Sequence, residues 1–234
     1  MTKLDLGVLI SGTGTNLQAV LDAIDDGRLD AQVRLVLSNK AKAAGLERAR
    51  RAGAPTSVVS HRDFASREQF DRALVDALDK AGARWIVLAG FMRILTPTFL
   101  QAFPQRVVNI HPALCPAFPG VDAQRQALAH GVRVTGCTVH LVDEGVDTGP
   151  ILAQAVVPVL ADDTRDSLAA RLLVREHEAL VTVLQWIAED RLSLTPPAEP
   201  SDRPVVQFRG VVPALGLSDP KLEPAVTGAA RIDD

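Results

Sequence analysis

Short apolar segments that alternate with amphipathic helical patterns constrain the fold of this chain more than any other feature. Patterns typical of buried strands occupy residues 4–10, 33–37, 56–59, 85–89 and 106–110. Apolar residues at helical spacing between them predict helices over residues 16–24, 43–52 and 66–81. A pair of parallel strands needs a long connection, usually a helix, so this alternation predicts a parallel sheet with helices on both faces. We therefore expect a doubly wound α/β fold.

The pattern changes after about residue 130. Residues 132–142 and 151–159 have the length and composition of two long strands joined by a loop, which favours an antiparallel pair. A long helix is predicted over residues 164–188, with Leu168, Leu172, Leu180, Leu184 and Ile187 toward the core. Prolines are frequent from residue 195 onward, so we expect an edge strand at 205–208 and otherwise a loosely ordered tail. The expected sheet is thus mostly parallel, with an antiparallel C-terminal portion.

The composition of the 234 residues argues against several classes of partner. The net charge is −3, there is no basic run, and aromatic residues make up 4% without any Tyr, so we expect no nucleic acid partner. The apolar run at residues 4–10 is too short to span a bilayer, so we expect no membrane association. Cys115 and Cys137 form no CxxC pair and the five His residues lack ligand spacing, so we expect a reducing cytoplasm and no metal site.

A glycine-containing turn, Ser11-Gly12-Thr13-Gly14-Thr15-Asn16, lies where the first strand passes into the first helix. Glycines let the backbone close on a ligand, and free N–H groups at the start of a helix favour an anion. Leu17 occupies the place of the third glycine of the dinucleotide fingerprint, and no Gly-Lys-Ser/Thr follows as in a Walker loop. The turn therefore predicts a phosphate site for a mononucleotide-sized ligand. A tight turn without a ligand is the alternative.

Asn109 and His111 are the first candidates for catalysis. They alternate in a strand that ends at Pro112, so both side chains point to one face. An amide can donate to a developing oxyanion and an imidazole can carry a proton near neutral pH, so the pair suits acyl-group chemistry. Asp147, in an acidic loop, is a candidate partner for His111, because a carboxylate favours the charged form of an imidazole. The structural alternatives are two hydrogen-bonded residues at a strand end and a turn Asp that caps its own loop.

A mostly apolar loop, residues 90–95, follows the strand predicted at 85–89. Crevices open at the carboxyl ends of parallel strands, so such a loop is expected to line a pocket. The alternative is that Phe91 and Ile94 fill the core.

Five segments together resemble the phosphoribosylglycinamide formyltransferases, the folate-dependent transformylases of purine synthesis. They are residues 9–17, 38–40, 89–95, 109–112 and 136–150, within a match over about residues 4–194. The resemblance implies transfer of a formyl group from 10-formyltetrahydrofolate to the amine of glycinamide ribonucleotide, by direct attack and without a covalent enzyme intermediate or a metal. The implied partners are these two small molecules, the implied location is the cytoplasm, and both a monomer and a homodimer remain open.

The resemblance also implies roles for single residues. Asn109, His111 and Asp147 correspond to a catalytic trio, in which Asn109 and protonated His111 stabilise the oxyanion. The implied ribonucleotide contacts are Gly14, Thr15, Asn16 and Glu176, and the implied folate contacts are Arg67, Met92, Arg93, Ile94, Leu95 and Asn109. The sequence alone would place Glu176 on a solvated helix face. Cys115 and Ala117 stand where the family more often has Leu and a basic residue, and their effect on loop packing or folate affinity is open.

The resemblance predicts one formyltransferase domain over residues 1–210, with a nucleotide-binding half at about 1–105 and a folate-binding and catalytic half at about 106–210. Residues 211–234 are then a proline-rich tail. Methionyl-tRNA formyltransferase shares such a core but would need a basic C-terminal domain. Formyltetrahydrofolate hydrolase would need a regulatory domain before the core, which begins here at about residue 4. A catalytically silent nucleotide-binding module is a further alternative, and the presence of the trio argues against it.

Overall fold

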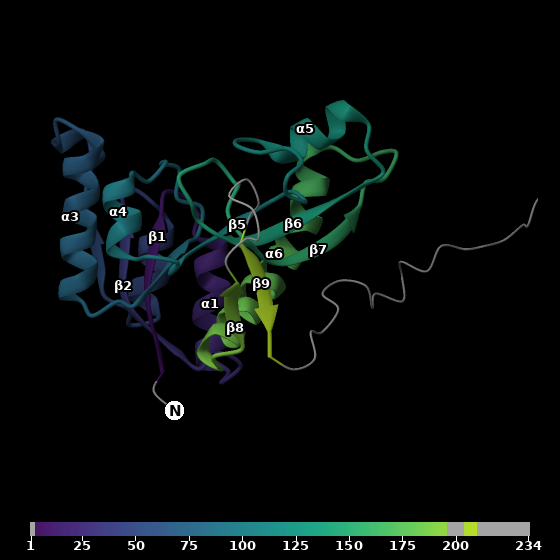
Figure 1. Ribbon diagram of the computed structural model, residues 1–234. Coiled ribbons are helices and arrows are strands. Elements are labelled where there is room, and N and C mark those ends of the chain that lie inside the picture. The colour runs from purple at the N-terminus through teal and green to yellow at the C-terminus, as the bar shows by residue number, and fades with distance from the viewer. Residues whose placement is uncertain (1–2, 196–203, 210–234) are drawn as a thin grey trace, which may run out of the picture.

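The computed structural model of the chain describes residues 3–195 and 204–209. A seven-stranded sheet with the order β3-β2-β1-β4-β5-β6-β7 forms the centre of the molecule (Figure 1). Its strands are β1 (Leu4–Ile10), β2 (Ala31–Ser38), β3 (Thr56–Val58), β4 (Trp85–Leu88), β5 (Val107–His111), β6 (Val134–Leu141) and β7 (Ile151–Pro158). Strands β1 to β5 pair in parallel, and β6 pairs antiparallel with both β5 and β7. The predicted fold class is thus confirmed, including the antiparallel C-terminal portion.

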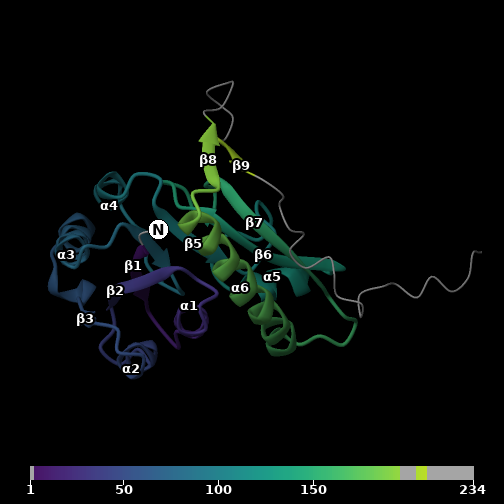
Figure 2. The same cartoon turned by 90° about the horizontal axis from the view of Figure 1, so that it is seen from below.

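Helices cover both faces of this sheet (Figure 2). They are α1 (Thr15–Asp25), α2 (Gly45–Arg51), the short 3₁₀ helix η1 (His61–Asp63), α3 (Arg67–Lys80), α4 (Pro97–Ala102), α5 (Ala123–His130) and α6 (Arg165–Ala188). One core cluster joins α1, α2 and α6 to Val8 of β1, and a second joins α3 and α4 to Leu9 of the same strand. Successive residues of β1 therefore face opposite helical layers, which explains why the strand is apolar throughout.

The boundaries predicted from the sequence agree with the structure to within two residues for each predicted strand and for the helices α1, α2, α3 and α6. The helices α4 and α5, the short helix η1 and the strand β8 (Leu192–Thr195) were not predicted from the sequence. The helices α4 and α5 have six and eight residues, too few to show a clear apolar period. Their ends are set by local signals, Pro97 at the first turn of α4 and Gly131 in the left-handed conformation after α5.

The strand expected at residues 205–208 forms as β9 (Val205–Phe208), but it does not lie at the edge of the large sheet. It pairs with β8 in a separate antiparallel hairpin. The Phe208 ring packs edge-on against Trp186 of α6, with 5.1 Å between the ring centroids, and this contact attaches the hairpin to the core. The tail predicted over residues 211–234 lies outside the described residues. No helix among the described residues is long and apolar enough to cross a membrane.

Candidate active site

The segments that follow β1, β4 and β5 meet at one edge of the sheet. These strands are parallel neighbours, so their carboxyl ends lie together. The Ser11 N–H donates to Gly90 O at 3.1 Å, and the Met92 N–H donates to Ser11 Oγ at 2.8 Å, which joins the turn after β1 to the loop after β4. The loop between β6 and β7 reaches β5 through Asp147. The segments singled out in the sequence therefore form one region.

The structure brings together the three residues predicted as a catalytic trio. Asp147 accepts a hydrogen bond from Asn109 Nδ2 through Oδ1 at 3.3 Å, and its Oδ2 lies 3.3 Å from His111 Nδ1. The Gly120 N–H also donates to Asp147 Oδ2, at 2.8 Å. One carboxylate thus fixes the positions of an amide, an imidazole and the loop that follows β5.

The environment of Asp147 favours its charged form. Burial alone would raise its pKa, but the hydrogen bond from the Gly120 N–H and the nearby charge of His111 outweigh burial and lower it. The backbone of Asp147 is in the left-handed region with φ of 53°, a conformation that Asp tolerates better than most side chains. The carboxylate is therefore held in place both by its donors and by an unusual backbone geometry.

Both ring nitrogens of His111 face groups that only accept hydrogen bonds. Nδ1 lies against Asp147, and Nε2 lies 2.8 Å from Phe118 O. A ring that is protonated on both nitrogens satisfies both contacts, whereas a neutral ring would leave one of them without a proton. His111 is buried, and Phe118 O is one of the groups in contact with its ring.

His140 is part of this cluster, although from the sequence it was only counted among the five His residues that lack metal-ligand spacing. Its Nε2 lies 3.1 Å from Asn109 Nδ2 and 3.6 Å from Asp147 Oδ1, and its side chain is 3% exposed. The Leu141 carbonyl accepts from Nδ1 at 2.8 Å, so Nε2 is left to accept from Asn109. His140 pairs with Asn109 across β5 and β6. The register of this antiparallel pair is the signal that could have predicted the contact between the two side chains.

The turn predicted to bind phosphate passes very close to α2. Gly14 has φ of +70° and precedes the first residue of α1 without a side-chain cap, so the first-turn N–H groups of α1 have no such acceptor. A Cβ atom on Gly14 would lie 2.6 Å from the Gly45 Cα atom. Glycine is therefore required at position 14 both for its backbone angle and for this close approach.

Asn16 and Glu176, both predicted ribonucleotide contacts, are hydrogen-bonded to each other although 160 residues separate them. The Asn16 Nδ2 donates to Glu176 Oε2 at 2.9 Å, and Asn16 Oδ1 is buried without a partner. Glu176 is 7% exposed, so the expectation of a solvated helix face was wrong: α6 packs this side of the helix against α1. Burial raises the pKa of Glu176, and the Asn16 hydrogen bond opposes that rise only in part.

The loop predicted to bind folate divides into inward and outward residues. Met92 and Ile94 are 63% and 56% exposed, whereas Phe91 and Leu95 are buried in the core beside α3 and α4. The alternative that this loop fills the core therefore holds for Phe91 and not for Ile94. Arg67 of α3 donates from its guanidinium to Ile94 O at 2.7 Å and so holds the backbone of the loop. Arg93, between Met92 and Ile94 in the chain, is half-buried.

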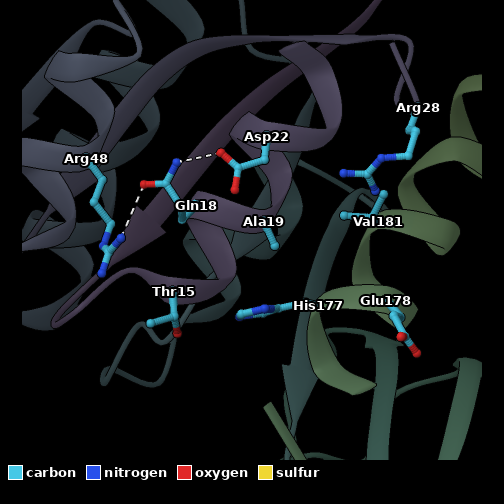
Figure 3. Close-up of a pocket in the computed structure, with 9 residues that line it drawn as sticks. All are labelled: Thr15, Gln18, Ala19, Asp22, Arg28, Arg48, His177, Glu178 and Val181. Carbon is cyan, nitrogen blue, oxygen red and sulfur yellow. Dashed lines mark hydrogen bonds between the residues drawn. The ribbon is translucent and has the colours of Figure 1, made fainter. Parts of the chain in front are cut away.

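A pocket of about 330 Å³ lies between α1, α2 and α6 (Figure 3). Thr15 and Gln18 line it from α1, and His177 lines it from α6. Arg48 of α2 donates to Thr13 O and to Gln18 Oε1, so it also braces the predicted phosphate turn. The three residues predicted as a catalytic trio do not line this pocket, which shares Thr15 with the predicted ribonucleotide contacts.

Comparison with known proteins shows the family to which this chain belongs. The formyl transferase family matches residues 5–184. Phosphoribosylglycinamide formyltransferase of Escherichia coli (strain K12) is 45% identical over 191 residues, which cover 82% of this chain and 90% of that protein. The crystal structure of glycinamide ribonucleotide transformylase 1 from Symbiobacterium toebii has a TM-score of 0.83 and 48% identity, and the match covers 88% of this chain and 94% of that one.

A longer relative matches as well. The trifunctional purine biosynthetic protein adenosine-3 of Drosophila melanogaster is 49% identical over 193 residues, and this chain spans 14% of that relative's length. The chain belongs to the formyl transferase family. Within that family it groups with the phosphoribosylglycinamide formyltransferases.

Proposed function

We propose that this chain transfers the formyl group of 10-formyltetrahydrofolate to the amine of glycinamide ribonucleotide, and that Asn109, His111 and Asp147 carry the reaction. The observation that supports these roles most directly is the contact of one carboxylate with both an amide and an imidazole. An oxyanion donor and a proton carrier held by one acceptor are what acyl transfer to an amine requires.

The proposed reaction begins with attack of the neutral amine on the formyl carbon. The new C–N bond forms as the carbonyl oxygen becomes an oxyanion, and the bond from the formyl carbon to the folate nitrogen then breaks. The amine loses one proton and the folate nitrogen gains one, so the reaction needs a group that relays a proton. His111, paired with Asp147, is the group placed to do so.

His111 must exchange a partner before it can donate to the oxyanion. In the structure its Nε2 is engaged by Phe118 O, so the formyl oxygen has to replace that carbonyl. Binding of the substrates is therefore expected to shift the segment around Phe118 away from the ring. A positioned donor to an oxyanion contributes roughly 2.7–4 kcal/mol to stabilisation of the transition state.

Asn109 is oriented by His140 as well as by Asp147. Its Nδ2 is shared between His140 Nε2 and Asp147 Oδ1, so donation to the oxyanion requires the release of one of these contacts. Since the Leu141 carbonyl fixes the proton on His140 Nδ1, His140 holds the Asn109 amide group with its nitrogen toward the cluster.

The two substrates are assigned to the two neighbouring segments. The ribonucleotide phosphate would bind the backbone at Gly14, Thr15 and Asn16. Glu176 and the unpartnered Asn16 Oδ1 would accept hydrogen bonds from the hydroxyl groups of the ribonucleotide. The folate ring would bind over Met92 and Ile94, whose apolar side chains are exposed on a loop held in place by hydrogen bonds.

A steady-state assay with glycinamide ribonucleotide and a 10-formyl folate analogue tests the proposal, with free formate measured in parallel. Transfer to the ribonucleotide without release of formate is expected. Formate release that does not depend on the ribonucleotide would show a hydrolase instead, and no turnover with either acceptor would refute the assignment.

A further inference from the structure

Asp71 is a carboxylate that the proposed reaction does not use, and it is almost completely buried. It lies on α3 and is 1% exposed. Its Oδ2 atom accepts two hydrogen bonds from one residue, from Thr96 N at 2.6 Å and from Thr96 Oγ1 at 2.7 Å. Thr96 is the last residue before α4 and directly follows the loop over residues 90–95.

Thr96 gives up a common local interaction to make this contact. A Thr at the position before a helix normally accepts a hydrogen bond from the helix backbone through its hydroxyl group. At the start of α4 that bond is absent, and the hydroxyl donates to Asp71 instead. Burial raises the pKa of Asp71, and the two hydrogen bonds from Thr96 oppose that rise only in part. The buried carboxyl group therefore carries a solvation cost.

The Asp71 contact adds to others that fix the backbone of this loop. Met92 N is held by Ser11 Oγ near its start, Ile94 O is held by Arg67 in its middle, and Thr96 is held by Asp71 at its end. The side chains of Met92 and Ile94 remain exposed on this fixed backbone. A surface with a fixed backbone and exposed apolar groups binds a planar ligand without first paying for ordering of the loop.

We propose that Asp71 is a positioning residue for the formyl donor: through Thr96 it fixes the loop over residues 90–95 in the conformation that receives the folate ring. This inference rests on the proposed binding of folate by that loop. Asp71 acts on the affinity for the donor and not on the transfer step, since its bonds run to Thr96 and not to the trio.

The test compares Asp71→Ala with Asp71→Asn. Alanine removes both bonds, whereas one amide oxygen of asparagine can accept both of them, as the single Oδ2 atom does here. For Asp71→Ala we expect KM for a 10-formyl folate analogue to rise about tenfold or more, with kcat and KM for the ribonucleotide nearly unchanged. Asp71→Asn should restore most of the affinity. Thr96→Val, which removes only the hydroxyl bond, should give a smaller rise and serves as a second variant if Asp71→Ala does not fold.

Asp76→Ala is the matched control, because Asp76 is an exposed carboxylate on the same helix. Asp76→Ala should change neither the KM for the formyl donor nor the KM for the ribonucleotide. Amide hydrogen exchange over residues 90–96 should accelerate in Asp71→Ala but not in this control.

Ile94→Ala separates the positioning role of Asp71 from the proposed binding of folate by the loop. If Ile94→Ala raises the donor KM while Asp71→Ala does not, the positioning role is wrong and the folate site stands. If neither variant changes the donor KM, both the positioning role of Asp71 and the proposed folate site are wrong. An equal loss of kcat and of affinity for both substrates would reduce Asp71 to a structural role.

Discussion

Replacement of Gly14 by Ala tests the close approach between the predicted phosphate turn and α2. Gly14 has φ of +70°, and a Cβ atom there would lie 2.6 Å from the Gly45 Cα atom, a backbone atom that cannot rotate away. The left-handed backbone angle costs an L-residue about 1–2 kcal/mol. Overpacking against a fixed neighbour costs about 1–3 kcal/mol more. Gly14→Ala should therefore destabilise the protein by about 2–5 kcal/mol.

Gly27→Ala is the control that isolates the contact with Gly45. Gly27 has nearly the same angle, φ of +73°, but no atom lies within 4 Å of the Cβ position, so only the backbone cost applies. Urea unfolding of both variants measures the difference, which we expect to be about 1–3 kcal/mol. The shifted turn should also raise KM for the ribonucleotide about tenfold or more in Gly14→Ala alone. Equal loss of stability in the two variants would refute the argument, because it would mean that α2 yields freely to the added methyl group.

The remaining predictions concern the charged and titrating groups of the site. His111→Ala should lower kcat by about 100-fold or more while the ribonucleotide still binds, as calorimetry would show; near-normal turnover would remove His111 from its proposed role. Asp147→Asn should lower kcat/KM by about tenfold or more and alter its pH profile. Because the folded-state pKa of Asp147 is lowered, the stability that its carboxylate contributes is present above the ordinary value of 3.8 and is lost as the pH falls through the lowered value, so the two proteins should converge in stability in acid. Glu176→Gln should behave in the opposite way: the raised pKa of Glu176 means that the wild-type protein loses stability as the pH rises above 4.5, so the variant should gain stability relative to it over that rise in thermal unfolding, and a constant difference would contradict the buried state of this carboxyl.

The long apolar elements could be predicted from the sequence because their periodicity is local. The residues of β1 are apolar on both faces, and α6 has a repeating apolar stripe over 24 residues, so their types and bounds follow from the pattern. The helices α4 and α5 could not be predicted in this way, since one or two turns of helix give too few repeats. The pairing of β9 with β8 instead of with the large sheet could not be predicted either, because strand partners depend on which surfaces remain free after the core has formed.

The sequence by itself determined the alternation of strands and helices, the glycine turn after β1, and the placement of Asn109 and His111 on one face of β5, because each depends on neighbours within a few residues. Only the tertiary structure decided that His140 joins the trio, that Glu176 is buried against Asn16, and that Asp71 holds Thr96. The physical reason is that burial and hydrogen-bond partners are properties of elements packed together. The same carboxylate pattern on a helix is solvated or buried according to the surface that the rest of the chain places opposite it.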